Sequence, residues 1–373
     1  MSIQVQELEC MEGMLGQIIL DAPASLNSLT LDMVEQMQQT LDRWAEDPRI
    51  CLVVLQGSGD RAFCAGGNIR NLYGALTGKE DRDAPVRFFT AEYRLDYSIH
   101  RFPKPILGLA HGVTMGGGLG LLSGCRYRLA TTDLTLAMPE VSIGLFPDVG
   151  ASHFLNRLPG RTGLFLGLTG ARLNISDALR IGLVDMAISD EVRSSLVSKL
   201  QEQRWTGNLA SDDSRLFRLL NQLDTLDYHA LPASPLARHE QDIARLIAGD
   251  QLPGIVDRLV NADITSDWWQ QSVGSLRDGC PVTAWLVWRQ LREAQQLTLR
   301  DVFRMELAMA LECIRRPDLS EGIRARLVDR DQSPVWSYPT VRDVPEEVVD
   351  RHFQPCWTDA DCPMGLSDSV LSG

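Results

Sequence analysis

Short apolar segments alternate with amphipathic segments over residues 1–205, and this alternation limits the possible folds more than any other feature of the chain. Residues 51–55 are continuously apolar and precede Gly57 and Gly59, as expected of a strand that is covered on both faces. Residues 30–45 carry apolar side chains three to four positions apart, the spacing of a helix with one buried face. Strands that alternate with helices predict an α/β fold with a parallel sheet.

Further elements fit the same pattern. Residues 5–8 and 15–20 predict a hairpin that turns at Glu12–Gly13. The other strands are expected at residues 106–110, 127–130, 134–137 and 184–188. Helices are expected at residues 85–100, from the glycine run at 116–118 toward residue 122, and before residue 184 with a cap near Ser176.

The sequence changes character after about residue 205. Residues 208–235 are polar and irregular, with two prolines near their end, and predict a boundary. Helical periodicity then recurs in residues 236–248, 282–294 and 299–313. We therefore expect an α/β domain over residues 1–205, a helical region over 206–340, and a loosely ordered tail over 341–373.

Composition limits the kind of partner. The chain has 373 residues, of which 44% are hydrophobic, enough for a large core. Its net charge of -13 argues against nonspecific binding to nucleic acid or to an anionic membrane, because either needs a basic surface. No apolar run approaches the roughly 20 residues that span a bilayer, and the first residues resemble neither a secretory signal nor a transit peptide. We expect a cytoplasmic protein with no nucleic-acid or membrane partner.

The cysteines do not indicate a metal site. The eight cysteines show no Cys-x-x-Cys spacing, so free and mostly buried thiols are expected. Cys356 and Cys362 could hold a metal only with ligands that the sequence does not identify.

Two glycine-rich segments are candidates for ligand binding. Gly66–Gly67 lies in a loop, and Gly116–Gly118 lies where a strand passes into a helix. Each can bring a backbone N–H close to a ligand without an obstructing Cβ. The alternative is that these glycines only permit tight turns and close packing of helix on strand.

Three carboxylates are candidates for acid–base chemistry. Glu140 follows Pro139 in an otherwise apolar segment, where a carboxyl group that lacks hydrogen bonds has a raised pKa and can act as a general acid or base. It could also cap the turn at Ser142. Asp148 directly precedes a predicted helix and could be its N-cap. Glu92 lies in a predicted helix, where a glutamate often belongs to a solvated face.

Six segments carry a recognisable pattern: Phe63–Arg70, His111–Gly118, Met138–Glu140, Gly144–Gly150, Glu321–Ala325 and Asp331–Pro334. In this order they resemble the crotonase, or enoyl-CoA hydratase/isomerase, superfamily. The later segments are most similar to its 3-hydroxyisobutyryl-CoA hydrolases. The resemblance runs from about Gly13 to Trp336 and implies a ββα spiral core with a C-terminal helical region.

The resemblance also implies roles for the glycine loops. The amides of Gly67 and Gly117 would form an oxyanion hole for a thioester carbonyl, and Gly66, Gly116 and Asn68 would lie against the substrate. Asn68 stands where the superfamily often has aspartate. It keeps the hydrogen-bonding shape and loses the charge.

The carboxylates distinguish the subfamilies. Glu140 matches a catalytic glutamate of the superfamily, and Asp148 with Glu92 matches positions that orient the substrate hydroxyl or the attacking water in the hydrolases. Hydratases use a second glutamate where this chain has Gly120, and they commonly have glycine where it has Asp148. The resemblance therefore implies hydrolysis of a short 3-hydroxyacyl-CoA, most closely 3-hydroxyisobutyryl-CoA in valine catabolism. Glu140 would be either the nucleophile or the base that activates water.

Two other functions stay open: a hydratase or isomerase of another acyl-CoA, and a non-catalytic CoA-binding or assembly protein. An acyl-CoA is the expected partner. Coenzyme A would be part of the substrate, and no cofactor is expected. Superfamily members are commonly trimers or hexamers, so a homo-oligomer is a further candidate. Arg61, Arg70 and Lys104 lie near the motifs, but nothing in the sequence assigns them to the CoA phosphates.

Overall fold

The computed structural model describes residues 3–358 and 361–366. It contains two compact units, each built from three segments of the chain. The first comprises Met1–Gly67, Leu95–Leu136 and Leu173–Pro235, and the second comprises Asn68–Arg94, Ala137–Arg172 and Leu236–Gly373. These divisions do not coincide with the boundaries predicted at residues 205 and 340, and the predicted three-part organisation stays a prediction.

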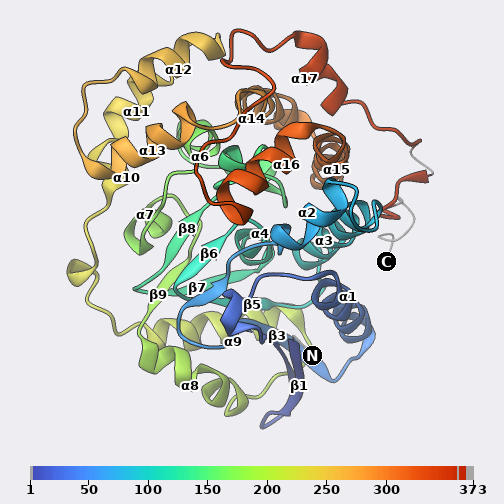
Figure 1. The fold of residues 1–373 in the computed structure, drawn as a ribbon. Helices are drawn as coiled ribbons and strands as arrows, with labels where there is room; N and C mark the ends of the chain where they lie inside the picture. Colours follow the sequence, from blue (N-terminus) through green and yellow to red (C-terminus); the bar gives the residue numbers. More distant parts are fainter. Residues whose placement is uncertain (1–2, 359–360, 367–373) are drawn as a thin grey trace. The chain divides into compact units, whose positions relative to one another are not determined.

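A six-stranded sheet lies within the first unit, in the order β1-β2-β3-β5-β7-β9 (Figure 1). β1 pairs antiparallel with β2, and all later neighbours are parallel. The predicted hairpin is confirmed, and its turn uses Gly13 with φ +74°. The strands are β1 Ile3–Glu9, β2 Met14–Leu20, β3 Ile50–Gly57, β5 Ile106–Ala110, β7 Tyr127–Thr131 and β9 Met186–Ile188.

One face of this sheet packs on α8 (Asp190–Gln201) and α9 (Leu209–Leu223), whose leucines form one buried cluster with Leu15 and other strand residues. α9 lies within the segment 208–235, which was predicted to be irregular, so that prediction is wrong there. Its polar residues mask a buried stripe at helical spacing, which includes Leu216 and Leu220.

The opposite face is lined by glycines that let helices approach closely. Side chains of neighbouring strand residues point to opposite sides of a sheet. Gly16 therefore faces away from Leu15, and a Cβ there would collide with the ring of Trp44 in α1 (Leu31–Glu46). Gly108 leaves the same kind of room for α4 (Gly117–Gly124). Helices on both faces of a largely parallel sheet confirm the predicted α/β class.

A second, three-stranded sheet has the order β4-β6-β8. Of these short strands, the sequence predicts only β8. β4 and β6 pair in parallel. The bounds are β4 Ala62–Cys64, β6 Val113–Met115 and β8 Thr135–Ala137, and the first unit also contains α7 (Ile175–Arg180), capped by Asn174, and the short 3₁₀ helices η1 (Pro23–Ser25) and η3 (Tyr228–Ala230).

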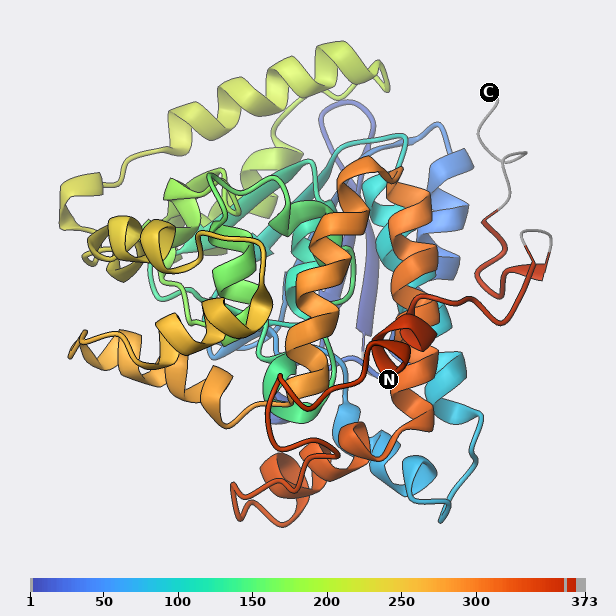
Figure 2. The same cartoon turned by 90° about the horizontal axis from the view of Figure 1, so that it is seen from above.

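The second unit is mainly helical. The helices predicted at 282–294 and 299–313 are confirmed as α14 and α15, and α17 packs on both of them (Figure 2). The helix predicted at 236–248 is instead two helices that break at His239. The elements are α2 Ile69–Leu76, α3 Ala84–His100 (its residues from Leu95 belong to the first unit), η2 Glu140–Ile143, α5 Ala151–Leu155, α6 Thr162–Thr169, α10 Pro235–Arg238, α11 Glu240–Leu246, α12 Leu252–Val260, α13 Asp267–Arg277, α14 Pro281–Glu293, η4 Ala294–Gln296, α15 Leu299–Arg315, α16 Pro317–Ile323, η5 Arg324–Val328 and α17 Glu346–His352.

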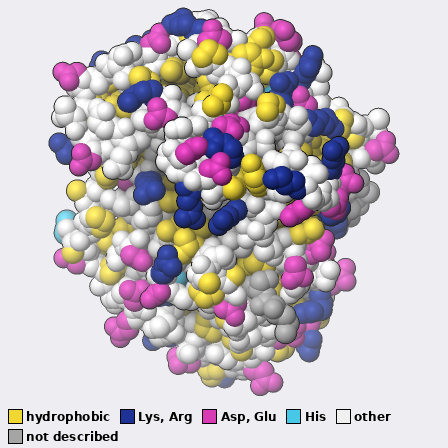
Figure 3. All heavy atoms as spheres, in the orientation of Figure 1, with side chains coloured by type: hydrophobic (Ala, Val, Ile, Leu, Met, Phe, Trp, Pro, Cys, Tyr) yellow, Lys and Arg dark blue, Asp and Glu magenta, His cyan; other side chains and the backbone are white. Residues whose placement is uncertain are grey.

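The predicted tail is partly helical, because α17 falls within residues 341–373; residues 359–360 and 367–373 of that tail lie outside the described part of the chain. Basic and acidic side chains are interspersed on the face drawn in Figure 3, although the net charge is -13. Among the described residues, no helix has both the length and the apolar character to cross a membrane. All eight cysteines are free thiols, and Cys356 is exposed.

Candidate active site

The two predicted glycine loops lie against each other in the first unit. Gly66 follows β4 and Gly116 follows β6, and these strands are parallel neighbours, so both loops leave the same edge of the small sheet. A Cβ on Gly66 would lie 3.2 Å from the amide nitrogen of Gly117 and 2.9 Å from the carbonyl oxygen of Met115. Gly66 and Gly116 also have φ of +93° and +51°, so glycine is required at both positions.

Each loop offers a backbone N–H that the fold does not use. Gly117 is the first residue of α4, where an amide has no acceptor within its own helix. The amide of Gly67 donates to no backbone acceptor in the part of the chain that the structure describes. Gly118 has a packing role, because a Cβ there would collide with the carbonyl of Cys64. Asn68 is half-buried at the N-cap of α2, and its side chain makes no capping bond.

The predicted carboxylates come together in the second unit. Glu92 on α3, Glu140 at the start of η2, and Asp148 in the loop before α5 are 2%, 6% and 4% exposed. Burial raises the pKa of Glu92 and of Glu140 well above the usual value, and the charge of Asp148 raises both further. Glu92 therefore does not belong to a solvated helix face, the alternative that the sequence left open.

Hydrogen bonding separates Asp148 from the two glutamates. Burial raises the pKa of Asp148 to about 7, and the Tyr93 hydroxyl, which donates to its Oδ2 at 2.6 Å, limits that rise. Glu92 Oε1 and Glu140 Oε2 are buried without a hydrogen-bond partner among the described residues. Buried carboxyl groups that raise one another's pKa do not all ionise at neutral pH, so the cluster retains protons that it can donate to a ligand.

Asp148 is not the N-cap of α5: Gly150 occupies that position, and the side chain of Glu306 satisfies amides at the start of the helix. Glu306 reaches from α15 and accepts the amides of Gly150 at 2.7 Å and Ser152 at 2.9 Å. Gln290 of α14 donates to the carbonyl of Pro147 at 2.8 Å and fixes the preceding turn. The Asp148 side chain is thus left to Tyr93 and to its neighbouring carboxyl groups.

The loop that carries Asp148 is strained. Val149 is buried with φ +53°, in the left-handed region that a β-branched residue rarely adopts, and Gly150 follows with φ +87°. A residue in this conformation costs on the order of 1–3 kcal/mol and persists only where its surroundings enforce it. The bonds from Gln290 and Glu306 supply that enforcement.

The sequence does not predict the residues that support this loop, Tyr93, Gln290 and Glu306, or the strain at Val149. One signal was available for Glu306. It lies on the apolar stripe of a predicted helix, between Phe303 and Met309, where a lone carboxylate needs partners. Nothing marks Tyr93 or Gln290, since their partners lie far away in the sequence.

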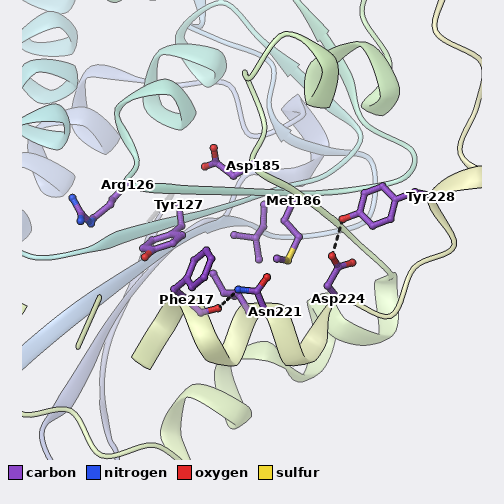
Figure 4. A pocket seen from close by; sticks show the side chains of 10 residues that line it. Arg126, Tyr127, Asp185, Met186, Phe217, Asn221, Asp224 and Tyr228 are labelled. Atoms are coloured by element: carbon purple, nitrogen blue, oxygen red, sulfur yellow. Dashed lines mark hydrogen bonds between the residues drawn. The ribbon is translucent and has the colours of Figure 1, made fainter. Parts of the chain in front are cut away.

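The basic candidates and a separate cavity do not add to the site. Lys104 is committed to the carbonyls of Trp44 and Asp47, at 2.5 and 2.6 Å, and Arg61 and Arg70 are exposed. A cavity in the first unit has a volume of about 470 Å³. Figure 4 shows side chains that line it, including Arg126, Tyr127, Phe217 and Tyr228. It contains no predicted site residue, and its charged groups are mostly paired, as with Arg126 and Asp213 at 2.5 Å.

A family model described as enoyl-CoA hydratase/isomerase matches residues 15–353. Among curated proteins, the chain is 37% identical over 343 residues to "3-hydroxyisobutyryl-CoA hydrolase, mitochondrial" of Danio rerio, which covers 91% of this chain and 87% of that protein. It is 35% identical over 343 residues to the protein of the same name from Homo sapiens, which covers 92% of this chain and 87% of that protein.

Solved structures agree with the fold. One is described as an enoyl-CoA hydratase from Rhodobacter sphaeroides, with a TM-score of 0.82 and 33% identity, covering 95% of this chain and 98% of that one. Another is described as a carnitinyl-CoA dehydratase from Mycobacterium thermoresistibile, with a TM-score of 0.82 and 31% identity, covering 95% of this chain and 96% of that one.

Proposed function

Because this chain belongs to the enoyl-CoA hydratase/isomerase family, we propose that it hydrolyses the thioester of a short 3-hydroxyacyl-CoA, specifically 3-hydroxyisobutyryl-CoA. The names of its relatives from Danio rerio and Homo sapiens support this substrate. The observation that carries the proposal is the buried cluster of Asp148 with Glu92 and Glu140.

The cluster suits a hydroxylated acyl group. Glu92 and Glu140 each have a buried oxygen without a partner among the described residues, and a substrate hydroxyl would satisfy one of them. An acyl group that lacks the hydroxyl would leave these buried groups unpaired, which a polar site penalises strongly.

The proposal assigns the steps of the reaction as follows. The amides of Gly67 and Gly117 donate to the thioester oxygen and stabilise the negative charge of the tetrahedral intermediate. Glu140 either attacks the carbonyl carbon or removes a proton from the water that attacks it. In the first case CoA leaves as a thiol after gaining a proton, and water then cleaves the mixed anhydride. Asp148, held by Tyr93, orients the substrate hydroxyl or the water.

A hydratase is the second candidate, because the two solved structures with a TM-score of 0.82 are described as a hydratase and a dehydratase. Gly120 counts against it, since the resemblance places a second glutamate of the hydratases there.

Thiol release from a panel of short acyl-CoA esters tests the proposal. The wild type should release CoA fastest from 3-hydroxyisobutyryl-CoA, and Glu140→Gln should lower kcat by roughly 10²–10⁴. Trapping with hydroxylamine, followed by mass spectrometry of the peptide that contains Glu140, would separate attack by Glu140 from activation of water. Addition of water to an enoyl-CoA without thiol release would instead establish the hydratase.

We further propose that coenzyme A enters only as part of the substrate and that the reaction belongs to valine breakdown. The names of the relatives contain the substrate, 3-hydroxyisobutyryl-CoA, and this substrate is what supports the pathway. A cytoplasmic location and a homo-oligomer stay predictions, and the same relatives are named mitochondrial.

A further inference from the structure

A small cavity in the second unit brings two arginines together without a carboxylate. It has a volume of about 200 Å³ and lies where the end of α5 and the start of α6 meet α14. Figure 1 shows α6 next to α14, and the two helices are in contact. Among the residues that line it are Arg161, Trp288 and Arg292, together with the amide side chains of Asn156 and Gln295.

Both guanidinium groups lie near one aromatic ring. The Cζ of Arg292 is 4.0 Å from the ring centroid of Trp288, and the Cζ of Arg161 is 5.4 Å from it. The ring therefore positions both cations. Burial lowers the pKa of Arg161, and the positive charge of Arg292 lowers it further, so the two charges repel each other.

Neither charge is neutralised by the described part of the chain. Arg161 donates to the carbonyls of Ile247 at 2.7 Å and Gly249 at 2.9 Å, and the structure records no ion pair for it or for Arg292 there. Other arginines of this unit have carboxylates: Arg289, on the same helix as Arg292, pairs with Glu293 and Asp350. In a chain with a net charge of -13, two exposed arginines that line one cavity and have no ion pair among the described residues form a local site for an anion.

We propose that this cavity binds the phosphoryl group of a small phosphorylated ligand, at a site other than the carboxyl cluster. Two guanidinium groups match a dianion in charge and can each donate in parallel to phosphate oxygens. The volume is below the roughly 300–1,000 Å³ of pockets that enclose whole drug-sized ligands. The cavity therefore takes an anionic group or a small anion rather than an entire nucleotide.

The inference does not depend on the proposed thioester hydrolysis, and calorimetric titration of the full chain with inorganic pyrophosphate tests it. We expect saturable binding that weakens as sodium chloride is added. Arg292→Gln should weaken this binding at least about tenfold, because it removes a charge-assisted contact. Arg292 makes no hydrogen bond within the described residues, so within the fold this substitution removes only its contact with the ring of Trp288.

Arg289→Gln is the matched control. Arg289 lies one turn earlier on α14 and also covers an aromatic ring, with its Cζ 4.5 Å from the centroid of Phe353, but it is already paired with carboxylates. Its substitution should change pyrophosphate affinity less than about twofold. Arg161→Gln should resemble Arg292→Gln, with thermal unfolding measured alongside because Arg161 also holds two carbonyls.

Two results would contradict a phosphoryl site at Arg161 and Arg292. Absence of binding by the wild type at millimolar pyrophosphate, or equal weakening by Arg289→Gln and Arg292→Gln, would overturn the proposal. A second titration uses free CoA. If CoA displaces pyrophosphate and also binds Arg292→Gln more weakly, the phosphoryl group is that of CoA. If it does neither, the site serves a different phosphorylated ligand.

Discussion

The glycine loops of the first unit and the carboxyl cluster of the second unit are built in opposite ways. The loops depend on local backbone geometry: Gly66 and Gly116 have positive φ, and each follows a short strand. The cluster depends on distant packing, since Asp148 is held by a tyrosine on α3 and its loop by a glutamate on α15. Backbone donors can therefore be prepared within a few residues, whereas buried acids require support from several helices.

The largest expected effect concerns the cost of the buried acids. Burial raises the pKa of Asp148 from 3.8 to about 7, so the folded state favours its neutral form. The contribution of this group to the free energy of unfolding is fully present below about pH 4 and is lost as the pH rises through about 7. This shift corresponds to at most about 4 kcal/mol. Asp148→Asn should therefore stabilise the fold at pH 8, because asparagine carries no charge. The same substitution should abolish hydrolysis, because the proposed mechanism uses Asp148 to orient the substrate hydroxyl or the water.

Urea unfolding at pH 8 and at pH 4 measures this effect, and the advantage of the variant should shrink at the lower pH. Asp213→Asn is a control of opposite sign, because the hydrogen bond from Arg126 lowers the pKa of Asp213, so this substitution should not stabilise the fold at pH 8. An advantage of Asp148→Asn that is the same at both pH values would show that the buried charge is not its cause.

The next effect tests the backbone donor. Gly117→Pro removes the amide hydrogen at the first position of α4, where proline suits a helix and no intrahelical bond is lost. We expect kcat to fall by about 10²–10³, with far-UV circular dichroism unchanged. Thiol release at the wild-type rate would exclude this amide from the oxyanion hole.

Substitution of the neighbouring Gly118 should lower the stability of the fold, whereas substitution of Gly117 should lower kcat. Gly118→Ala places a methyl group against the carbonyl of Cys64 and should destabilise the fold by about 1–3 kcal/mol in urea unfolding. Gly274→Ala is the control, because no atom lies within 4 Å of a Cβ added in the middle of α13. It should be neutral or stabilise by up to about 1 kcal/mol. Equal destabilisation of both variants would contradict the packing role of Gly118.

The smallest effect concerns the tyrosine that supports Asp148. The Tyr93 hydroxyl stabilises the ionised form of Asp148, so Tyr93→Phe should raise the pKa of Asp148 further. The acidic limb of kcat/KM against pH should move upward by about one unit. Tyr127→Phe removes a similar hydroxyl–carboxylate bond to Asp213, 2.9 Å long, and should leave the profile unchanged. A profile that stays fixed in Tyr93→Phe would mean that this limb does not report on Asp148.

The sequence predicts the α/β class, the opening hairpin and the site residues more readily than it predicts their supports. Periodicity reveals α1, α14 and α15, because each buries one clear apolar stripe. It fails for α9, whose many polar residues suggest a linker. It also fails for β4 and β6, which have three residues each and are too short to show a period.

The same limit applies to the candidate site. Glycine pairs and a Pro-Glu step are local signals, and the resemblance to a family places them in order. Whether Asp148 caps α5 depends on Glu306, which competes for the same amides from 154 residues or more away. No pattern within a short window records such a competition.

The left-handed conformation of Val149 has a consequence for how the protein tolerates change. A strained backbone conformation is the first to relax when the packing that enforces it weakens. We therefore expect substitutions that weaken the packing of α14 or α15 to let the turn at residues 147–150 relax before the rest of the second unit unfolds. This holds even for substitutions far from the carboxyl groups. Heating should then inactivate the enzyme at a lower temperature than the temperature at which the chain unfolds. The strain at Val149 sets the difference between these two temperatures.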